Sequence, residues 1–307
     1  MQYKQSWFAT GLIGSNLRQN SNDMKELNLP QQPVLEILEN ACSRYEQCTV
    51  YILGHHNSNI IIEQISKTAN WAVHHFYLLV ITAKQIPATG TVMANSIHEL
   101  SGKTITATVM LHKPTDLATQ QPHQIRFFNQ ALRFGYRLCL DKENPPYLVA
   151  NTVPPLNREE DTAFWLKCEA VALFNIQAAK ENPQQGVELC KIALLNTACT
   201  QIALGLIRVL MHYTPNEFGL KYLLQLCQYT YHNNERQNEN PLPSAFNPKT
   251  MTDKYRLNSL CAPPSMLNHK LHLNAPEEDF MYLLTATQDF LNQATNRINS
   301  FSEKAIT

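Results

Sequence analysis

The sequence lacks an excess of charge of either sign. Its 307 residues include 25 Lys and Arg and 25 Asp and Glu, so the net charge is zero when His is neutral. Proteins that bind nucleic acid over a broad surface are usually basic. The balance therefore excludes a polyanion-binding surface over the whole protein and gives no sign of DNA binding. Only local patches are left for contacts with a nucleotide or RNA.

Closely spaced cysteines are also missing. The eight cysteines form no Cys-x-x-Cys pair, and most of them lie within apolar runs. We interpret them as reduced core thiols rather than as metal ligands or disulfides. The cysteines are Cys42, Cys48, Cys139, Cys168, Cys190, Cys199, Cys227 and Cys261.

Long hydrophobic runs are the third absence. No stretch approaches the ~18 consecutive apolar residues of a membrane span. The apolar run near the start, residues 8–13, is too short and too poorly flanked for a signal peptide. We therefore expect a soluble, cytoplasmic protein without a membrane partner.

The sequence does contain enough apolar surface for two domains, since 44% of its residues are hydrophobic. We divide it into an N-terminal extension rich in Asn, Gln and Ser (1–32), an α/β domain (33–144), a proline-rich linker (145–156) and an all-helical domain (157–307). The expected fold is an α+β domain with a small mixed sheet, followed by an all-α helical bundle.

The first domain shows alternating helix and strand patterns. Apolar residues spaced three or four apart after Pro33 predict a helix, and β-branched or continuous apolar runs predict strands. Gly54 is expected to end the first strand. The predicted strands cover 48–53, 76–81, 104–111 and 136–140, and the predicted helices cover 33–41, 91–100 and 123–134.

The second domain is organised around residues 192–210, where apolar side chains leave little of the helix circumference polar. We expect this helix at the centre of a bundle. Pro215 should end it, so that a shorter helix runs from Asn216 to Tyr229. Other helices are expected over 157–180, 252–260 and 277–304, with caps at Asn157 and Thr252 and a surface loop with almost nothing to bury at 232–248.

The long apolar helix, the break at Tyr213, Thr214 and Pro215, and the shorter Leu-rich helix after it resemble the core of HEPN domains. These small helical modules are often fused behind a nucleotidyltransferase-like domain. The resemblance implies a homodimer that forms through the helical bundle. It also implies a place in a toxin–antitoxin or stress-defence system.

The first domain resembles the minimal nucleotidyltransferase fold, in which a Gly-Ser turn approaches the triphosphate and an Asp-x-Asp strand holds Mg²⁺. Here His55 follows Gly54, and His75, Phe76 and Tyr77 stand in the Asp-x-Asp place. Imidazole and phenol cannot replace carboxylates as Mg²⁺ ligands. We therefore predict no nucleotidyl transfer, and a vestigial nucleotide cleft formed by Gly54, His55, His75 and Tyr77.

A polar stripe crosses the central helix and ends in Arg208 and His212. Arg208 could hold a nucleotide phosphate in a groove along this stripe. Arg208 and His212 also resemble the Arg and His of catalytic HEPN ribonucleases, where His serves acid–base chemistry. Their interval is shorter than in the family motif, so the alternative is a polar face closed against neighbours or solvent. The stripe consists of Thr197, Gln201, Gly205, Arg208 and His212.

A second basic group, His269, Lys270 and His272, precedes the last helix, where the family motif is expected. It predicts either an anion site around Lys270 with His269 and His272 as weak catalytic candidates, or a solvated loop.

Two more groups are open to a functional and a structural interpretation. The doubled histidines could share Zn²⁺ or Ni²⁺, but neighbouring residues of a strand point to opposite faces, so we favour hydrogen bonding or exposure. A basic group around the helix at 123–134 could contact phosphate, but we favour a solvated face. The groups are His55, His56, His74 and His75, and His123, Arg126, Arg133, Arg137 and Lys142.

These patterns together predict a non-catalytic regulatory protein that binds a nucleotide, RNA or a protein partner without a metal or cofactor. The alternative is a metal-independent HEPN-type ribonuclease that acts through Arg208 and His212, or through His269 and His272.

Overall fold

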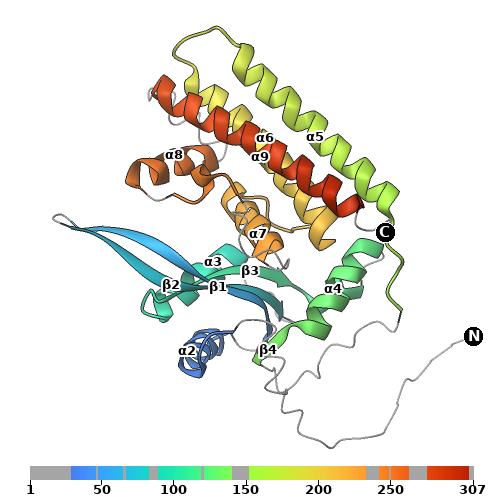
Figure 1. Cartoon of the computed structure of the whole chain (residues 1–307). Helices are drawn as coiled ribbons and strands as arrows, with labels where there is room; N and C mark the ends of the chain where they lie inside the picture. Colours follow the sequence, from blue (N-terminus) through green and yellow to red (C-terminus); the bar gives the residue numbers. More distant parts are fainter. Residues whose placement is uncertain are drawn as a thin grey trace, which may run out of the picture.

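The computed structural model describes residues 29–45, 48–64, 67–82, 89–118, 121–139, 152–232, 242–248, 250–262 and 275–303. Most of the predicted N-terminal extension and most of the predicted linker lie outside these ranges. Within them the chain has an α+β fold, in which a small sheet with flanking helices lies below a group of long helices (Figure 1).

The sheet has four strands in the order β3-β2-β1-β4. They are β1 (Cys48–Gln64), β2 (Lys67–Thr82), β3 (Ile105–His112) and β4 (Tyr136–Cys139). β2 runs parallel to β3, whereas β1 pairs with β2 and β4 in antiparallel fashion, which confirms the predicted mixed sheet.

The prediction that Gly54 ends the first strand is wrong. β1 continues to Gln64 as part of a long hairpin with β2, and only a register shift between Ile52 and Gly54 marks the glycine. A shift of this kind accommodates one extra residue without ending the pairing. Figure 1 shows the hairpin projecting beyond the rest of the sheet.

Helices cover both faces of the sheet. The near-continuous apolar runs of its central strands place apolar side chains on both faces, as such burial requires. One face packs on α2 (Gln32–Cys42) and α3 (Gly90–Leu100) through residues that include Ile52, Leu78 and Val80. The other face, with Leu79 and Ile81, joins the core of the helical half. Of the two hydrophobic core clusters, the one on this face therefore continues from the sheet into the bundle.

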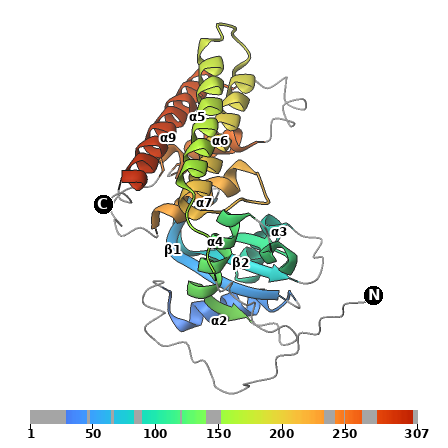
Figure 2. The ribbon, with the colours of Figure 1, turned by 90° about the vertical axis from the view of Figure 1, so that its right-hand side faces the viewer.

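The helical half contains α5 (Arg158–Glu181), α6 (Glu188–Met211), α7 (Leu220–His232), α8 (Met251–Cys261) and α9 (Glu277–Glu303). Figure 2 shows α5, α6 and α9 side by side above the sheet half, with α2 at its far side. The side chains of Leu195, Ile202 and Leu206 in α6 are fully buried, which confirms the predicted central helix.

The helix α6 is long and apolar enough to cross a membrane, contrary to the expectation that no stretch approaches such a span. The most apolar 18-residue window of α6 has a mean hydropathy of 1.5, and 67% of it is buried inside the protein. A core helix of a soluble protein passes the same test, and this burial is consistent with a soluble protein.

Three predicted details of the bundle are wrong. The helix after Pro215 begins at Leu220 rather than Asn216, and Thr250 rather than Thr252 caps α8 by accepting from the Asp253 amide. The predicted loop also buries more than expected. Leu242 enters the core, and so do Ala245 and Phe246 of a short 3₁₀ helix, Ser244–Phe246. The loop was predicted from its mainly polar composition, which gave too little weight to these few apolar residues.

The late start of α7 has a physical reason, since the residues before it bind the sheet half. The side-chain Nδ2 of Asn216 donates to the Leu111 carbonyl at 2.5 Å. The Glu217 carboxylate accepts hydrogen bonds from the Gly90 amide and the Thr91 hydroxyl at the beginning of α3. A carboxylate is favourable at this positive end of a helix. These contacts fix the two halves against each other.

The cysteines described by the structure are free, and most are buried as predicted. Cys42, Cys48, Cys168, Cys199 and Cys227 are buried, Cys261 is half-buried, and Cys190 is exposed.

Candidate functional site

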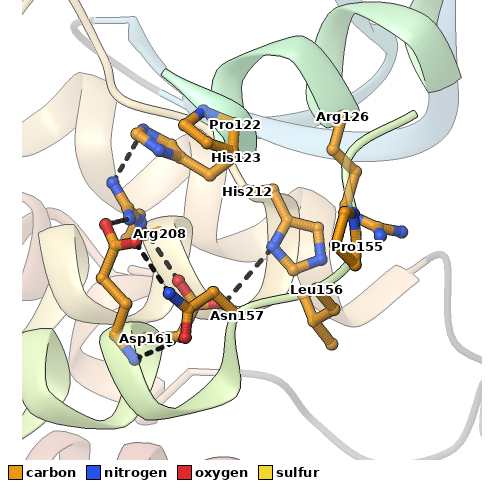
Figure 3. A pocket seen from close by; sticks show the side chains of 10 residues that line it. Pro122, His123, Arg126, Pro155, Leu156, Asn157, Asp161, Arg208 and His212 are labelled. Carbon is orange, nitrogen blue, oxygen red and sulfur yellow. Dashed lines mark hydrogen bonds and ion pairs between the residues drawn. The ribbon is translucent and has the colours of Figure 1, made fainter. Parts of the chain in front are cut away.

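Arg208 and His212 end α6 at the junction of the two halves, where they face α4 (Pro122–Phe134) of the sheet half. Together with residues of α4 and of the beginning of α5, they line a small, partly open pocket (Figure 3). The lining residues are Pro122, His123, Arg126, Pro155, Leu156, Asn157, Glu160, Asp161, Arg208 and His212.

Arg208 is the most heavily bonded side chain of the pocket. Its Nε donates to Asp161 Oδ1 at 3.2 Å and its Nη2 donates to Glu160 Oε1 at 2.6 Å. Its Nη1 donates to His123 Nε2 at 2.7 Å, and Phe164 lies beneath the guanidinium at 5.5 Å. Only 10% of the Arg208 side chain is exposed. The two carboxylates neutralise its charge, as a buried cation requires.

Arg208 also determines the tautomer of His123. A guanidinium has no acceptor, so His123 Nε2 must accept the bond from Arg208 and the ring proton must sit on Nδ1. Thr214 Oγ1 also lies 2.8 Å from this nitrogen. Burial, followed by the nearby Arg208 charge, lowers the pKa of His123 to about 4. His123 is therefore a neutral acceptor at physiological pH.

His212 caps α6 in the left-handed conformation, with φ 55° and ψ 31°. The residue is 7% exposed, and its Nδ1 is buried without a hydrogen-bond partner. The nearest carboxylate oxygen, Asp161 Oδ2, lies 3.7 Å away, which is too long for a hydrogen bond. Burial, followed by the positive charge of Arg126, lowers the pKa of His212 to about 4. A single water molecule in the pocket is enough to supply the missing partner of this nitrogen.

Arg126 is the second cation of the pocket, and its environment differs from that of Arg208. Its Nη2 donates to the Pro154 carbonyl at 2.8 Å. Within the described part of the chain, no carboxylate forms an ion pair with it. Most of its five N–H donors are therefore available.

The beginning of α5 supplies the anions. Asn157 caps this helix by accepting from the Glu160 amide at 3.2 Å, which confirms the predicted cap. Glu160 and Asp161 in the first turn then reach Arg208. Burial raises the pKa of the Asp161 carboxyl, while the bond to Arg208 opposes this shift.

The rest of the predicted polar stripe forms no groove. A Cβ atom on Gly205 would lie 2.5 Å from Trp165 Cε3, so α5 passes directly over this position. Thr197 returns its hydroxyl to the Ala193 carbonyl of its own helix. Only the end of the stripe, Arg208 and His212, reaches the pocket, and the upper part is a helix–helix contact.

The predicted nucleotide cleft is divided between the two faces of the sheet. His55 lies beside His74 and Phe76 on the face covered by α2 and α3, whereas His75 and Tyr77 lie on the bundle face. Tyr77 is 1% exposed. Gly54 lies under Tyr229 of α7, which would be 3.0 Å from an added Cβ. The four residues therefore line no common cleft, because α7 covers the face on which three of them lie and His55 lies on the other face.

The doubled histidines have ordinary polar partners. His55 Nε2 lies 3.0 Å from His74 Nδ1, and His75 bonds to the hydroxyls of Thr106 and Thr108 at 2.8 and 3.0 Å. His56 stacks on Tyr77. One histidine of each doublet is on each face, as strand geometry predicts. Among the described residues no three His, Cys, Asp or Glu side chains are grouped for a metal ion.

Some predicted residues lie outside the described ranges, namely His269, Lys270, His272 and Lys142. Arg133 is exposed and stacks on Phe134 at 5.5 Å.

Sequence reasoning noted both sides of the pocket separately but not their convergence. His123 and Arg126 appeared there as a basic helix face, and Arg208 and His212 as the end of a stripe. Neither Glu160 nor Asp161 was predicted as a site residue. No sequence signal joins residues 123–126 to residues 208–212, because the tertiary packing of α4 against α6 brings them together.

Comparison with models of known protein families, with curated proteins and with solved structures finds no match. The interpretation of the pocket therefore rests on its geometry and chemistry.

Proposed function

We propose that the chain is a non-catalytic, nucleotide- or RNA-binding regulatory protein of the cytoplasm. In this proposal the sheet half is a nucleotidyltransferase-like domain without its metal site, and the helical half is a HEPN-like bundle. By the same resemblance it belongs to a toxin–antitoxin or stress-defence system. The pocket between the halves, rather than the sheet, is the binding site.

The observation that carries this proposal is the convergence of Arg126, Arg208, His123 and His212 from two halves on one pocket. Buried titratable groups with shifted pKa values gather at functional sites more often than elsewhere. A ligand held there touches α4 of one half and α6 of the other. Binding would therefore alter how firmly the halves are joined, which is a regulatory effect.

The state of Arg208 supports binding over catalysis. Two carboxylates and His123 occupy its donors, so it is not free to stabilise a transition state without rearrangement. In the sheet half, His75 and Tyr77 occupy the expected metal positions and cannot hold Mg²⁺.

The apolar outer face of α5 supports the proposed homodimer. Val171, Leu173 and Phe174 are 42%, 52% and 72% exposed, and Leu166 is 55% exposed. Contiguous exposed apolar side chains often mark a protein–protein contact. Sedimentation of the purified chain tests the proposed dimer, and a monomer at micromolar concentration would contradict it.

A thermal-shift panel of nucleotides and short RNA, with and without Mg²⁺, tests the binding function. A ligand at about 100 times its Kd adds about 2.7 kcal/mol to the free energy of unfolding. We expect a shift that does not depend on Mg²⁺. The absence of a shift with every nucleotide and RNA would overturn the proposal.

A metal-independent ribonuclease is the second candidate, and His212 favours it. Its neutral imidazole has an unpartnered Nδ1 in the pocket that holds Arg208, as a general base requires. An RNA-cleavage assay in a chelator, on wild type, His212→Asn and His269→Ala, separates the candidates. Cleavage that either substitution abolishes would replace binding with catalysis as the function.

A further inference from the structure

We propose that two copies of this chain associate through their α5 helices, which run antiparallel and cross at Ala170. The partner on this surface is a second copy of the same chain. This inference rests on the homodimer in the proposed function, and it adds the contact surface, the relative direction of the two helices and their register.

The contact surface is the outer stripe of α5. Figure 1 shows α5 at the outer side of the bundle, and in Figure 2 it lies in front of α6. Exposed small and apolar residues recur along its outer side at intervals of three, four and three positions, which places them on one face. The stripe consists of Ala163, Leu166, Ala170 and Leu173, with Phe174 beside the last of them.

This stripe is more apolar than the solvent side of an ordinary bundle helix, which is polar or charged. Leu166 and Leu173 are about half exposed. Phe174, at 72%, is the most exposed large hydrophobic residue in the part of the chain that the structure describes. Burial of these side chains against a matching helix would remove apolar surface from water, which favours association.

The stripe is complementary to its own copy. A two-fold axis at Ala170 sets each residue against the one that lies equally far from Ala170 in the other direction. Leu166, four positions before Ala170, then lies beside Leu173 of the partner subunit, three positions after it. Ala170 faces its own copy, and two methyl side chains at the crossing let the helix axes approach to about 8 Å.

The flanks of the stripe favour the antiparallel direction. Lys167 and Phe174 lie on one flank, seven positions apart, and Glu169 lies on the other. An antiparallel pair brings like flanks together, so Lys167 lies over the ring of Phe174 of the partner subunit, and the face of an aromatic ring attracts a cation. A parallel pair would instead set the carboxylate of Glu169 against that ring, whose face is negative.

The ends of α5 make a smaller contribution in the same direction. The first turn contains Glu159, Glu160 and Asp161, and the last turn contains Lys180 and Glu181. An antiparallel pair sets each acidic turn against a mixed turn, whereas a parallel pair would set two acidic turns together. The contribution is small because Arg208 already offsets Glu160 and Asp161.

Disulfide trapping of the full chain tests the crossing point. The background is Cys190→Ser, which removes an exposed thiol, and this background alone is oxidised as the blank. Ala170→Cys should give a disulfide-linked dimer under mild oxidation, because its copies meet at the axis. Ala163→Cys is the matched control. Its copies lie about 21 Å apart along the helices, at 1.5 Å per residue, too far for a disulfide.

A charge in the stripe tests the surface independently. Leu173→Glu places a carboxylate where the two copies would exclude water, so sedimentation should show a dimer Kd at least about tenfold higher than that of the wild type. Leu173 is half exposed in the single chain, so the melting temperature of the monomer should stay near that of the wild type. Val92→Glu, at an equally exposed apolar residue of α3, is the control and should leave the dimer unchanged.

The outcomes separate this inference from the proposed homodimer. If the wild type sediments as a monomer, both fail. If it is a dimer that Leu173→Glu leaves intact and Ala170→Cys does not trap, the homodimer stands and its interface lies elsewhere. Equal trapping through Ala163→Cys and Ala170→Cys would show a parallel pair and would overturn the antiparallel crossing.

Discussion

Two groups of histidines in this molecule have opposite surroundings. On the sheet, His55, His56, His74 and His75 contact one another, aromatic rings or threonine hydroxyls. Between the halves, His123 and His212 lie among two arginines and two carboxylates. The pKa of each pocket histidine is lowered to about 4.

The difference shows that a conspicuous sequence pattern need not be a site. The sheet histidines are adjacent in sequence and drew attention for that reason, but His55, His74 and His75 bond to neutral partners and His56 stacks on Tyr77. The pocket histidines are isolated in sequence and become a charged group only through folding. The predictions below test this contrast.

The largest effect is expected from Arg208→Gln. The substitution leaves the Asp161 carboxylate, whose side chain is 10% exposed, without its cation. Breaking a buried ion pair from one side costs about 3–5 kcal/mol of unfolding free energy. Urea denaturation measures this loss of unfolding free energy. Substitution of the exposed Arg133 by Gln is the control, and its loss should be under about 0.5 kcal/mol. A loss below about 1 kcal/mol would mean that the pair is solvated.

The Gly205→Ala substitution should cause the next largest loss of unfolding free energy. Alanine normally stabilises a helix by about 1 kcal/mol relative to glycine. Here its Cβ would meet Trp165 at 2.5 and 2.9 Å, so α5 and α6 must separate. Overpacking of this kind costs about 1–3 kcal/mol.

Gly219→Ala is the matched control for Gly205→Ala, because nothing lies within 4 Å of its added Cβ. Its unfolding free energy should stay close to that of wild type. Equal stability of the two variants would show that the helices are not in close contact at Gly205.

Local patterns predicted the fold far better than the site. The period of apolar residues gave α6 and α9, and the Asn157 cap was recognisable because its partner Glu160 is three residues away. The predicted strand end at Gly54 was wrong because a strand can continue past a glycine with a shift in register. The pocket forms only where α4 contacts α6. No local sequence pattern predicts a contact between segments so far apart in the chain.

Stability should depend on pH through His212. Its folded pKa of about 4 lies below its unfolded value of 6.5, so the unfolded chain binds more protons between these values. Stability is therefore complete above about pH 6.5 and is lost as the pH falls toward 4, with about 2 kcal/mol gone by pH 5.

His212→Asn should remove the share of this pH dependence that belongs to His212 and leave the share of His123, whose pKa is also lowered to about 4. Urea denaturation of the wild type and of the His212→Asn variant between pH 5 and 7 measures the two stability profiles. Identical profiles would assign the acid sensitivity to other groups.

The smallest effect is expected at the sheet. His55 is half-buried, and His55→Gln keeps a polar side chain beside His74. The loss of stability should be under about 1 kcal/mol, with an unchanged thermal shift by nucleotides. Loss of that thermal shift in this variant would place the binding site on the sheet.

The most direct test of the pocket as the ligand site is a nuclear magnetic resonance titration of the His212 imidazole, with and without the nucleotide that gives the largest thermal shift. Our account predicts a pKa near 4 in the free protein and a clear change when the nucleotide binds. A pKa near 6.5 that the nucleotide leaves unchanged would show an open, ordinary histidine and would contradict the account.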